Sequence, residues 1–183
     1  MQNINEVLDK LEKESMYYGI PILGPEKGQL VRDLIQKHQP KNLLEIGTSI
    51  GYSAVTMAQS MPENAKLTTL EINHNYSDQA QSFIIEAGME SKIKVMTGNA
   101  LEIIPELNEK FDFVLLDGAK DQFWFYLDLL ESKLNPGAVI VANNVKLYMT
   151  QVKDYLDRVL NSGKFENSYH EFGDDAMEVS IKK

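Results

Sequence analysis

The sequence has no cysteine, so neither a disulfide nor a thiolate metal site is available to its 183 residues. It also has no apolar run that approaches the roughly 20 residues needed to span a bilayer. The amino-terminal stretch through Lys13 is polar and acidic, which is not the pattern of a secretory signal. These absences predict a cytoplasmic protein that makes no use of a membrane.

Positive charge is also scarce, because 18 lysines and arginines face 27 aspartates and glutamates, for a formal net charge of −9. Broad binding to a phosphate backbone needs an excess of basic residues. A nucleic-acid substrate is therefore disfavoured, although a local basic patch would still permit one. The hydrophobic fraction of 43% is ordinary for a globular protein, and we expect a single α/β domain over residues 1–183.

The stretch 42–53, Asn-Leu-Leu-Glu-Ile-Gly-Thr-Ser-Ile-Gly-Tyr-Ser, organises the chain. It begins as a short apolar run typical of a buried strand, passes Gly47 and Gly51, and enters an expected helix over 52–61. Strand, glycine loop and helix together build a ligand crevice in α/β sheets. The spacing of the two glycines matches neither a dinucleotide fingerprint nor a Walker loop. It favours a nucleoside ligand without a diphosphate, S-adenosylmethionine above all, with an ordinary strand-to-helix turn as the alternative.

The rest of the chain alternates expected helices and strands. An apolar loop at 16–24, broken by two glycines and a proline, separates the first two helices. Helices are expected over 2–15, 25–38, 52–61, 73–88, 101–107, 121–134 and 147–160, and parallel strands from Asn42 and over 66–71, 93–97, 111–116 and 138–142, with a turn at 135–137. Segments 165–172 and 177–181 read as a closing antiparallel hairpin. This order predicts a Rossmann-like α/β fold, a mostly parallel seven-stranded sheet with helices on both faces.

Two polar residues follow the second and third expected strands, at the edge of the sheet where parallel strands bind ligands. Glu71 ends the second strand 24 positions after Gly47, which suits a carboxylate that accepts both hydroxyls of a ribose. Its alternative is a surface glutamate. Asn99 follows the third strand, where its side chain would either hold the edge of an adenine or form a turn.

A second polar group follows the fourth and fifth expected strands. Asp117 ends the fourth strand, and Asn143 and Asn144 end the fifth. One carboxylate and two amide oxygens are hard ligands suited to Mg²⁺ or Ca²⁺, although asparagines are also common in turns. Lys120 lies three residues past Asp117, and near a cation or desolvated it would act as a base. A solvated loop lysine is the alternative.

Four motifs make the chain resemble a known family, the cation-dependent class I O-methyltransferases that include the catechol and caffeoyl-CoA enzymes. They are Gly-Pro-Glu-Lys-Gly-Gln at 24–29, Leu-Glu-Ile-Gly-Thr-Ser-Ile-Gly-Tyr-Ser at 44–53, Leu-Glu-Ile at 70–72 and Val-Leu-Leu-Asp-Gly-Ala-Lys at 114–120. The resemblance covers about residues 16–181. It implies S-adenosylmethionine as methyl donor, a hydroxyl as acceptor, Mg²⁺ or another divalent cation as cofactor, and a homodimer.

The same resemblance implies a role for each matching position. The donor would be held by Leu23, Glu45, Gly47, Ser53, Glu71, Ile72, Asn99, Ala100 and Asp117, the metal by Asp117, Asn143 and Asn144, and the chemistry carried by Lys120 as base with Asp117. Residues 1–38 would form a helical segment on the substrate side, shorter than in the mammalian catechol enzyme. Apart from the resemblance, the aromatic and apolar side chains suit a flat acceptor, so the pocket would be lined by Met16, Tyr17, Tyr18, Trp124 and Tyr148, with a core or a dimer contact as the alternative.

This sequence departs from the family at two positions. The family's fifth-strand pair is normally Asp-Asn, and here it is Asn143-Asn144, which removes one formal charge from the expected metal site. Asn99 stands where an aspartate is more usual. The first prediction is a small-molecule O-methyltransferase acting on an aromatic or catechol-like acceptor. The alternatives are a tRNA-modifying methyltransferase of the same fold, and a donor-binding protein whose metal-dependent catalysis is weakened or lost.

Overall fold

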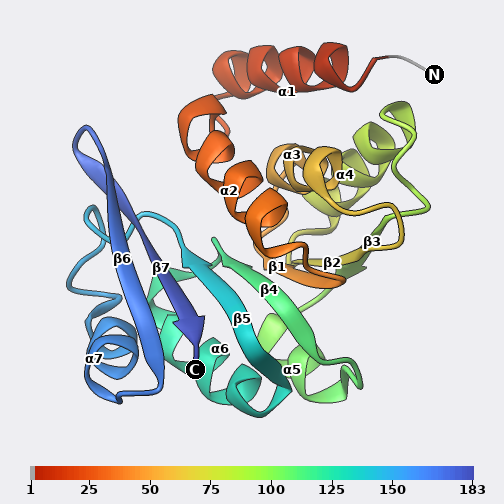
Figure 1. Ribbon diagram of the computed structural model, residues 1–183. Helices are drawn as coiled ribbons and strands as arrows, with labels where there is room; N and C mark the ends of the chain where they lie inside the picture. The colour runs from red at the N-terminus through yellow and green to blue at the C-terminus, as the bar shows by residue number, and fades with distance from the viewer. Residues whose placement is uncertain (1–2) are drawn as a thin grey trace.

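The computed structural model describes residues 3–183, and in it one sheet lies between two layers of helices (Figure 1). The helices are α1 Ile4–Tyr18, α2 Pro25–His38, α3 Tyr52–Ser60, α4 His74–Glu86, α5 Ala100–Glu106, α6 Phe123–Leu130 and α7 Lys153–Asn161, with short 3₁₀ turns at Lys120–Gln122 and Glu131–Lys133. The strands are β1 Asn42–Ile46, β2 Lys66–Glu71, β3 Ile93–Thr97, β4 Phe111–Leu116, β5 Leu134–Ala142, β6 Phe165–Phe172 and β7 Asp175–Lys182. The predicted fold class is confirmed.

The seven strands lie in the order β3-β2-β1-β4-β5-β7-β6. Strands β1 to β5 are mutually parallel, and β7 and β6 close the sheet as an antiparallel hairpin. The order reverses between β1 and β4, so the connections that leave these two strands run in opposite directions. In sheets of this kind ligands bind beyond the carboxyl ends of the strands at such a reversal.

The core is divided into two apolar clusters, one on each face of the sheet. Leu43 and Leu44, adjacent in β1, belong to opposite clusters because successive side chains of a strand point to opposite faces. Helices α1 to α4 cover the first cluster, with α1 outermost, and α5 to α7 cover the second (Figure 1). Burial on both faces explains why the central strand β4 contains a continuous apolar run, 113–116.

The helix α1 is longer than predicted. It begins after Asn3, whose side chain accepts from the N–H of Asn5, and ends at Gly19 in the left-handed conformation (φ 66°). Residues 16–18 are therefore helical, and the predicted loop at 16–24 is wrong for them. The first residue of the helix predicted over 2–15, Gln2, lies outside the described residues.

Three boundaries in the carboxyl-terminal half also differ from the prediction. Residues 135–137 do not form a free turn, because β5 begins at Leu134 and a register shift against β4 accommodates the proline and glycine. The helix predicted over 121–134 is α-helical only over Phe123–Leu130, with a 3₁₀ turn at each end, and residue 134 already belongs to β5. The helix predicted over 147–160 starts only at Lys153, because the chain first turns at Asn144 (φ 62°) and the N–H of Leu147 donates to Asp175 Oδ1 at 3.3 Å.

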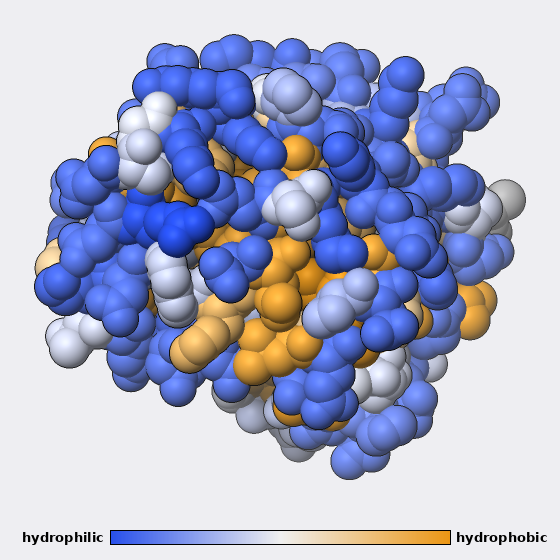
Figure 2. Space-filling model, turned by 90° about the horizontal axis from the view of Figure 1, so that it is seen from below, coloured by the Kyte–Doolittle hydropathy of each residue, from blue (hydrophilic) through white to orange (hydrophobic). Residues whose placement is uncertain are grey.

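The surface on one face is mostly polar, with apolar side chains gathered near its centre (Figure 2). A mostly polar surface around an apolar interior is expected for a chain in which one-quarter of the residues are charged. Within residues 3–183 we find no helix with the length and apolar character that crossing a bilayer requires.

Glu178, a buried carboxyl in β7, makes the stability of the fold depend on pH. It accepts hydrogen bonds from the hydroxyls of Tyr155, at 2.9 Å, and Ser180, and burial raises its pKa to about 7. A folded-state pKa above the unfolded value contributes stability below about pH 4.5, which is lost as the pH rises through 7. We therefore expect Glu178→Gln to remove a pH-dependent loss of up to about 3 kcal/mol in the free energy of unfolding.

Urea denaturation of wild type and Glu178→Gln between pH 5 and 8 measures this effect. Glu166→Gln, on the exposed side of β6, is the matched control and should follow the wild-type curve. Curves for wild type and Glu178→Gln that stay parallel over this range would show that Glu178 does not titrate there.

Candidate functional site

A cavity of about 530 Å³ opens at the carboxyl ends of β1 to β5, next to the reversal in strand order. Its volume lies in the range of small-molecule sites, and every parallel strand contributes to its wall. The lining residues that the sequence had singled out are Gly47, Glu71, Ile72, Asn99, Ala100, Asp117, Lys120, Asn143, Asn144 and Tyr148. The loops after five separate strands thus bring together residues spread over a hundred positions.

The glycine loop after β1 lets two strands approach each other closely. Gly47 has φ 103°, and a Cβ at this position would lie 2.7 Å from the backbone carbon of Asp117 and 2.8 Å from its oxygen. Its N–H donates to Leu70 O at 2.9 Å, which ties the loop to β2. Only glycine combines this conformation with such an approach. The loop then leads into α3, whose first N–H groups lack partners within the helix.

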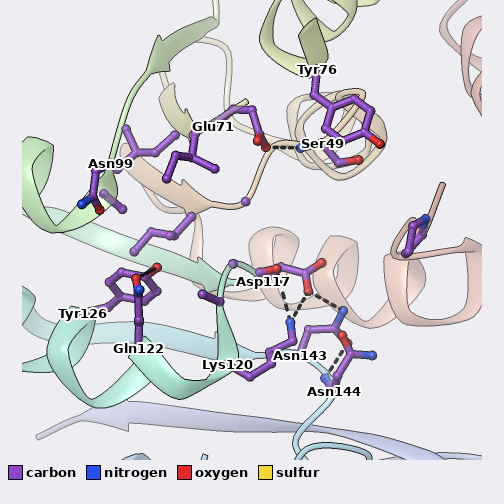
Figure 3. Close-up of a pocket in the computed structure, with 18 of the residues that line it drawn as sticks. Ser49, Glu71, Tyr76, Asn99, Asp117, Lys120, Gln122, Tyr126, Asn143 and Asn144 are labelled. Atoms are coloured by element: carbon purple, nitrogen blue, oxygen red, sulfur yellow. Dashed lines mark hydrogen bonds and ion pairs between the residues drawn. The ribbon is translucent and has the colours of Figure 1, made fainter. Parts of the chain in front are cut away.

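Glu71, at the end of β2, is held in place by the backbone around it. Its Oε2 accepts from the N–H of Ser49 at 2.8 Å and its Oε1 from the N–H of Asn73 at 2.9 Å, and the residue is only 7% exposed (Figure 3). Each carboxylate oxygen can accept a further hydrogen bond. Glu71 is therefore a fixed acceptor in the cavity wall and not a free surface glutamate.

Asn99 and Ala100 lie at the start of α5. The side chain of Asn99 accepts from the N–H of Leu101 at 3.0 Å and caps the helix. The turn-forming role considered for this asparagine is thus present in the structure. Its amide nitrogen remains available to a ligand, and the adenine role stays a prediction.

Asp117 and Lys120 form an ion pair in the wall of the cavity. Lys120 Nζ lies 2.7 Å from Asp117 Oδ1 and 3.2 Å from the backbone oxygen of the same residue (Figure 3). The lysine side chain is 10% exposed, and its ammonium lies 5.1 Å from the centre of the Phe123 ring. Lys120 is therefore packed and oriented, unlike a solvated loop lysine.

The two asparagines after β5 join this pair to a second one. Asn143 Nδ2 donates to Asp117 Oδ1 at 3.0 Å, and Asn143 Oδ1 accepts from Lys27 Nζ at 2.9 Å. Lys27 also pairs with Asp175, which accepts from Asn144 Nδ2 at 2.6 Å. Neither Lys27 nor Asp175 was predicted to take part in the site. The only signal was the motif 24–29, which contains Lys27 and had no assigned role for it.

The donor set fits a divalent cation poorly. Asp117 is its only carboxylate, and Oδ1 of that residue already accepts from a lysine and an amide. Asn143 turns its amide nitrogen, and not its oxygen, toward Asp117. Within residues 3–183 no three histidine, cysteine, aspartate or glutamate side chains gather as metal ligands would. Hard cations need several oxygen ligands that are free to coordinate, and their affinity rises with the number of charged ligands.

Three residues assigned to the donor do not line the cavity. Leu23, Glu45 and Ser53 are all at least 94% buried, and Leu23 belongs to the apolar cluster on the first face. The carboxylate of Glu45 points into the protein, where its Oε2 accepts a hydrogen bond from the hydroxyl of Thr69. Burial raises the pKa of Glu45 to about 7.

Glu45 nonetheless has one feature that fits a ligand nearby. Its Oε1 is buried and has no hydrogen-bond partner among the described residues, two positions before Gly47. Unpartnered buried oxygens are rare and are often completed by a bound group. The close approach of the backbone at Gly47 and the fixed carboxylate of Glu71 together fit a nucleoside in the cavity.

Only one of the residues predicted to line the acceptor pocket lies at this cavity. Met16, Tyr17 and Tyr18 are exposed on the last turn of α1. The ring of Trp124 packs against Arg158, whose guanidinium carbon lies 4.8 Å from the centre of the ring. None of these four lines the cavity. Tyr148 does, and the other apolar and aromatic lining comes from Pro21, Ile22, Ile46, Leu70, Tyr76 and Tyr126.

Comparison with known proteins agrees with this geometry. A family model described as O-methyltransferase matches residues 2–167. The chain is 37% identical over 133 residues to a catechol O-methyltransferase of Niastella koreensis, covering 69% of this chain and 60% of that protein. It is 35% identical over 174 residues to a catechol O-methyltransferase of Sus scrofa, covering 88% and 92%.

A solved structure gives the same fold. The O-methyltransferase TomG from Streptomyces achromogenes, involved in tomaymycin synthesis and crystallised with S-adenosylmethionine, superposes with a TM-score of 0.89 at 25% identity, covering 97% of this chain and 90% of that one. This chain thus spans nearly all of TomG and of the Sus scrofa relative, but only about 60% of the length of the Niastella koreensis relative.

Proposed function

The chain belongs to the O-methyltransferase family, and from that membership we propose that it transfers the methyl group of S-adenosylmethionine to a hydroxyl of a small, aromatic or catechol-like acceptor. The observation that carries the proposal is one cavity whose wall contains Gly47, Glu71, Asp117 and Lys120. The space left by Gly47 and the fixed carboxylate of Glu71 suit an adenosyl group. The Asp117–Lys120 pair beside them suits proton transfer from an acceptor hydroxyl.

The donor would be held on the side of the cavity formed by β1, β2 and β3. Glu71 would accept the ribose hydroxyls, Asn99 and Ala100 would border the adenine, and Gly47 leaves room for the chain between ribose and amino acid. S-adenosylmethionine bound there supplies a methyl group activated by a sulfonium. Holding donor and acceptor in line accounts for a large part of the rate advantage in such transfers.

Lys120, after losing one proton of its ammonium to solvent, would receive the proton that leaves the acceptor hydroxyl. Asp117, 2.7 Å away, orients the lysine and is itself oriented by Asn143. An oxyanion is a far better nucleophile than a hydroxyl, and a positioned base contributes about 10²- to 10⁴-fold to such steps.

The divalent cation, the homodimer and the cytoplasmic location stay predictions. For the cation, the single carboxylate of the donor set is an argument against tight binding. Nothing specific in the structure favours the tRNA-modifying alternative, and the net charge of −9 is unfavourable for it.

Transfer of a radiolabelled methyl group to a panel of catechols and phenols tests the proposal. We expect label in at least one acceptor together with an equal amount of S-adenosylhomocysteine. Binding of S-adenosylhomocysteine without transfer to any hydroxylated acceptor would favour the alternative of a donor-binding protein. The proposal would be contradicted if the protein showed no binding of S-adenosylhomocysteine and no methyl transfer.

A further inference from the structure

A buried ion pair lies directly behind the cavity. Lys27, in the first turn of α2, pairs with Asp175, the first residue of β7, and their side chains are 13% and 9% exposed. Neither residue lines the cavity, but each contacts one of the two asparagines that do. The pair therefore reaches the cavity only through Asn143 and Asn144.

The contacts of Asn143 fix the orientation of its amide. Its oxygen accepts from two donors, Lys27 Nζ at 2.9 Å and the N–H of Asn144 at 2.9 Å, and its nitrogen donates to Asp117 Oδ1 at 3.0 Å. The flipped amide would place an NH₂ group against an ammonium and an N–H, and an oxygen against a carboxylate. Asn143 is also only 3% exposed, so water cannot compensate for such a reversal.

The charges of Lys27, Lys120, Asp117 and Asp175 balance one another without a metal. Two ammonium groups, Lys27 and Lys120, face two carboxylates, Asp175 and Asp117. A divalent cation bound by Asp117 and Asn143 would have to displace the contacts of Lys120 and Lys27 with these residues and would then lie beside two positive charges. An aspartate at position 143 would change this balance, because it would add the carboxylate that the expected metal site lacks.

We propose that Lys27 and Asp175 replace the divalent cation in this chain: through Asn143 they hold Asp117 and Lys120 in their working arrangement, so that methyl transfer needs no metal. The inference rests on the proposed O-methyltransferase function. Lys27 is a positioning residue, since it acts through Asn143 and touches no reacting atom. A chain built in this way is not restricted to acceptors with two adjacent hydroxyls, because no cation is there to chelate them.

Binding of Mn²⁺ to the whole chain, followed by electron paramagnetic resonance, tests the metal part without donor or acceptor. We expect a Kd weaker than about 1 mM for wild type, and binding at least about tenfold tighter in Lys27→Gln/Asn143→Asp, which removes one ammonium and adds one carboxylate. Lys37→Gln, exposed in the last turn of the same helix, is the control and should bind as wild type does. Wild-type binding tighter than about 1 mM would overturn the inference, whether or not the double variant folds.

Kinetics in a chelator test the positioning part. We expect wild-type transfer to be unchanged within about twofold by EDTA, whereas kcat falls at least about tenfold in Lys27→Gln and is restored by Lys27→Arg, with S-adenosylhomocysteine affinity unchanged. A large loss of wild-type transfer in EDTA would overturn the inference and leave the proposed function standing. Failure to bind S-adenosylhomocysteine would instead overturn the proposed function, and the Mn²⁺ titration would still decide the metal question.

Discussion

Gly47→Ala should lose both donor binding and stability, with a fall of about 3–5 kcal/mol in the free energy of unfolding. The new Cβ would lie 2.7–2.8 Å from the backbone of Asp117 and Gly118, which no side-chain movement can relieve. The positive φ of 103° adds strain for any residue with a Cβ. The ends of β1 and β4 would have to separate, and Asp117 would leave its place in the cavity wall.

A second glycine, Gly137, distinguishes the clash of the new Cβ with the backbone from the strain of a positive φ. Gly137 also has a positive φ, 79°, but nothing lies within 4 Å of its Cβ position. Gly137→Ala should therefore cost only about 1 kcal/mol and leave donor binding unchanged. Urea denaturation and calorimetric titration with S-adenosylhomocysteine measure both quantities. Equal stability of the two variants, with binding retained in Gly47→Ala, would contradict the close approach of β1 and β4.

Lys120→Met should lower kcat by about 10³-fold while leaving the affinity for S-adenosylhomocysteine within about threefold. Methionine keeps much of the length and packing of lysine over Phe123 but can neither receive a proton nor stabilise an oxyanion. The adenosyl group is expected beside Glu71 on the other side of the cavity, so its binding should not depend on Lys120. Single-turnover transfer from labelled donor measures the chemical step directly.

The control for this substitution is Lys110→Met, an exposed lysine before β4. It should have wild-type kcat and affinity. If Lys120→Met retained more than about a tenth of wild-type kcat, the ion pair with Asp117 would be structural and another group would take the proton.

Strands could be predicted from the sequence more closely than helices. The bounds of β2, β3 and β4 agree with the prediction because each strand is a short β-prone segment followed by polar or glycine residues. The region 147–152 could not be predicted, since a contact with Asp175, almost thirty positions away, holds it outside a helix. The proline and glycine of 135–137 indicated a turn, and only the partner strand shows that they lie within a bulged β5.

In the candidate site, too, some residues could be predicted from the sequence and others could not. Glu71, Asp117 and Lys120 follow parallel strands, whose carboxyl ends meet at one edge, so their convergence could be predicted from order alone. The side chain of Glu45, within β1, points into the core toward Thr69 of the neighbouring strand, and no local sequence signal indicates this. The pair Lys27–Asp175 joins residues 148 positions apart, and no spacing rule connects them.

The central claim is that the cavity holds an adenosyl donor against Glu71, and calorimetric titration with S-adenosylhomocysteine tests it most directly. We expect one site per chain in wild type and in the exposed control Glu63→Gln, and at least about tenfold weaker binding in Glu71→Gln, which loses a charged acceptor for the ribose hydroxyls. Absence of binding in wild type, or equal affinity in Glu71→Gln, would contradict the account.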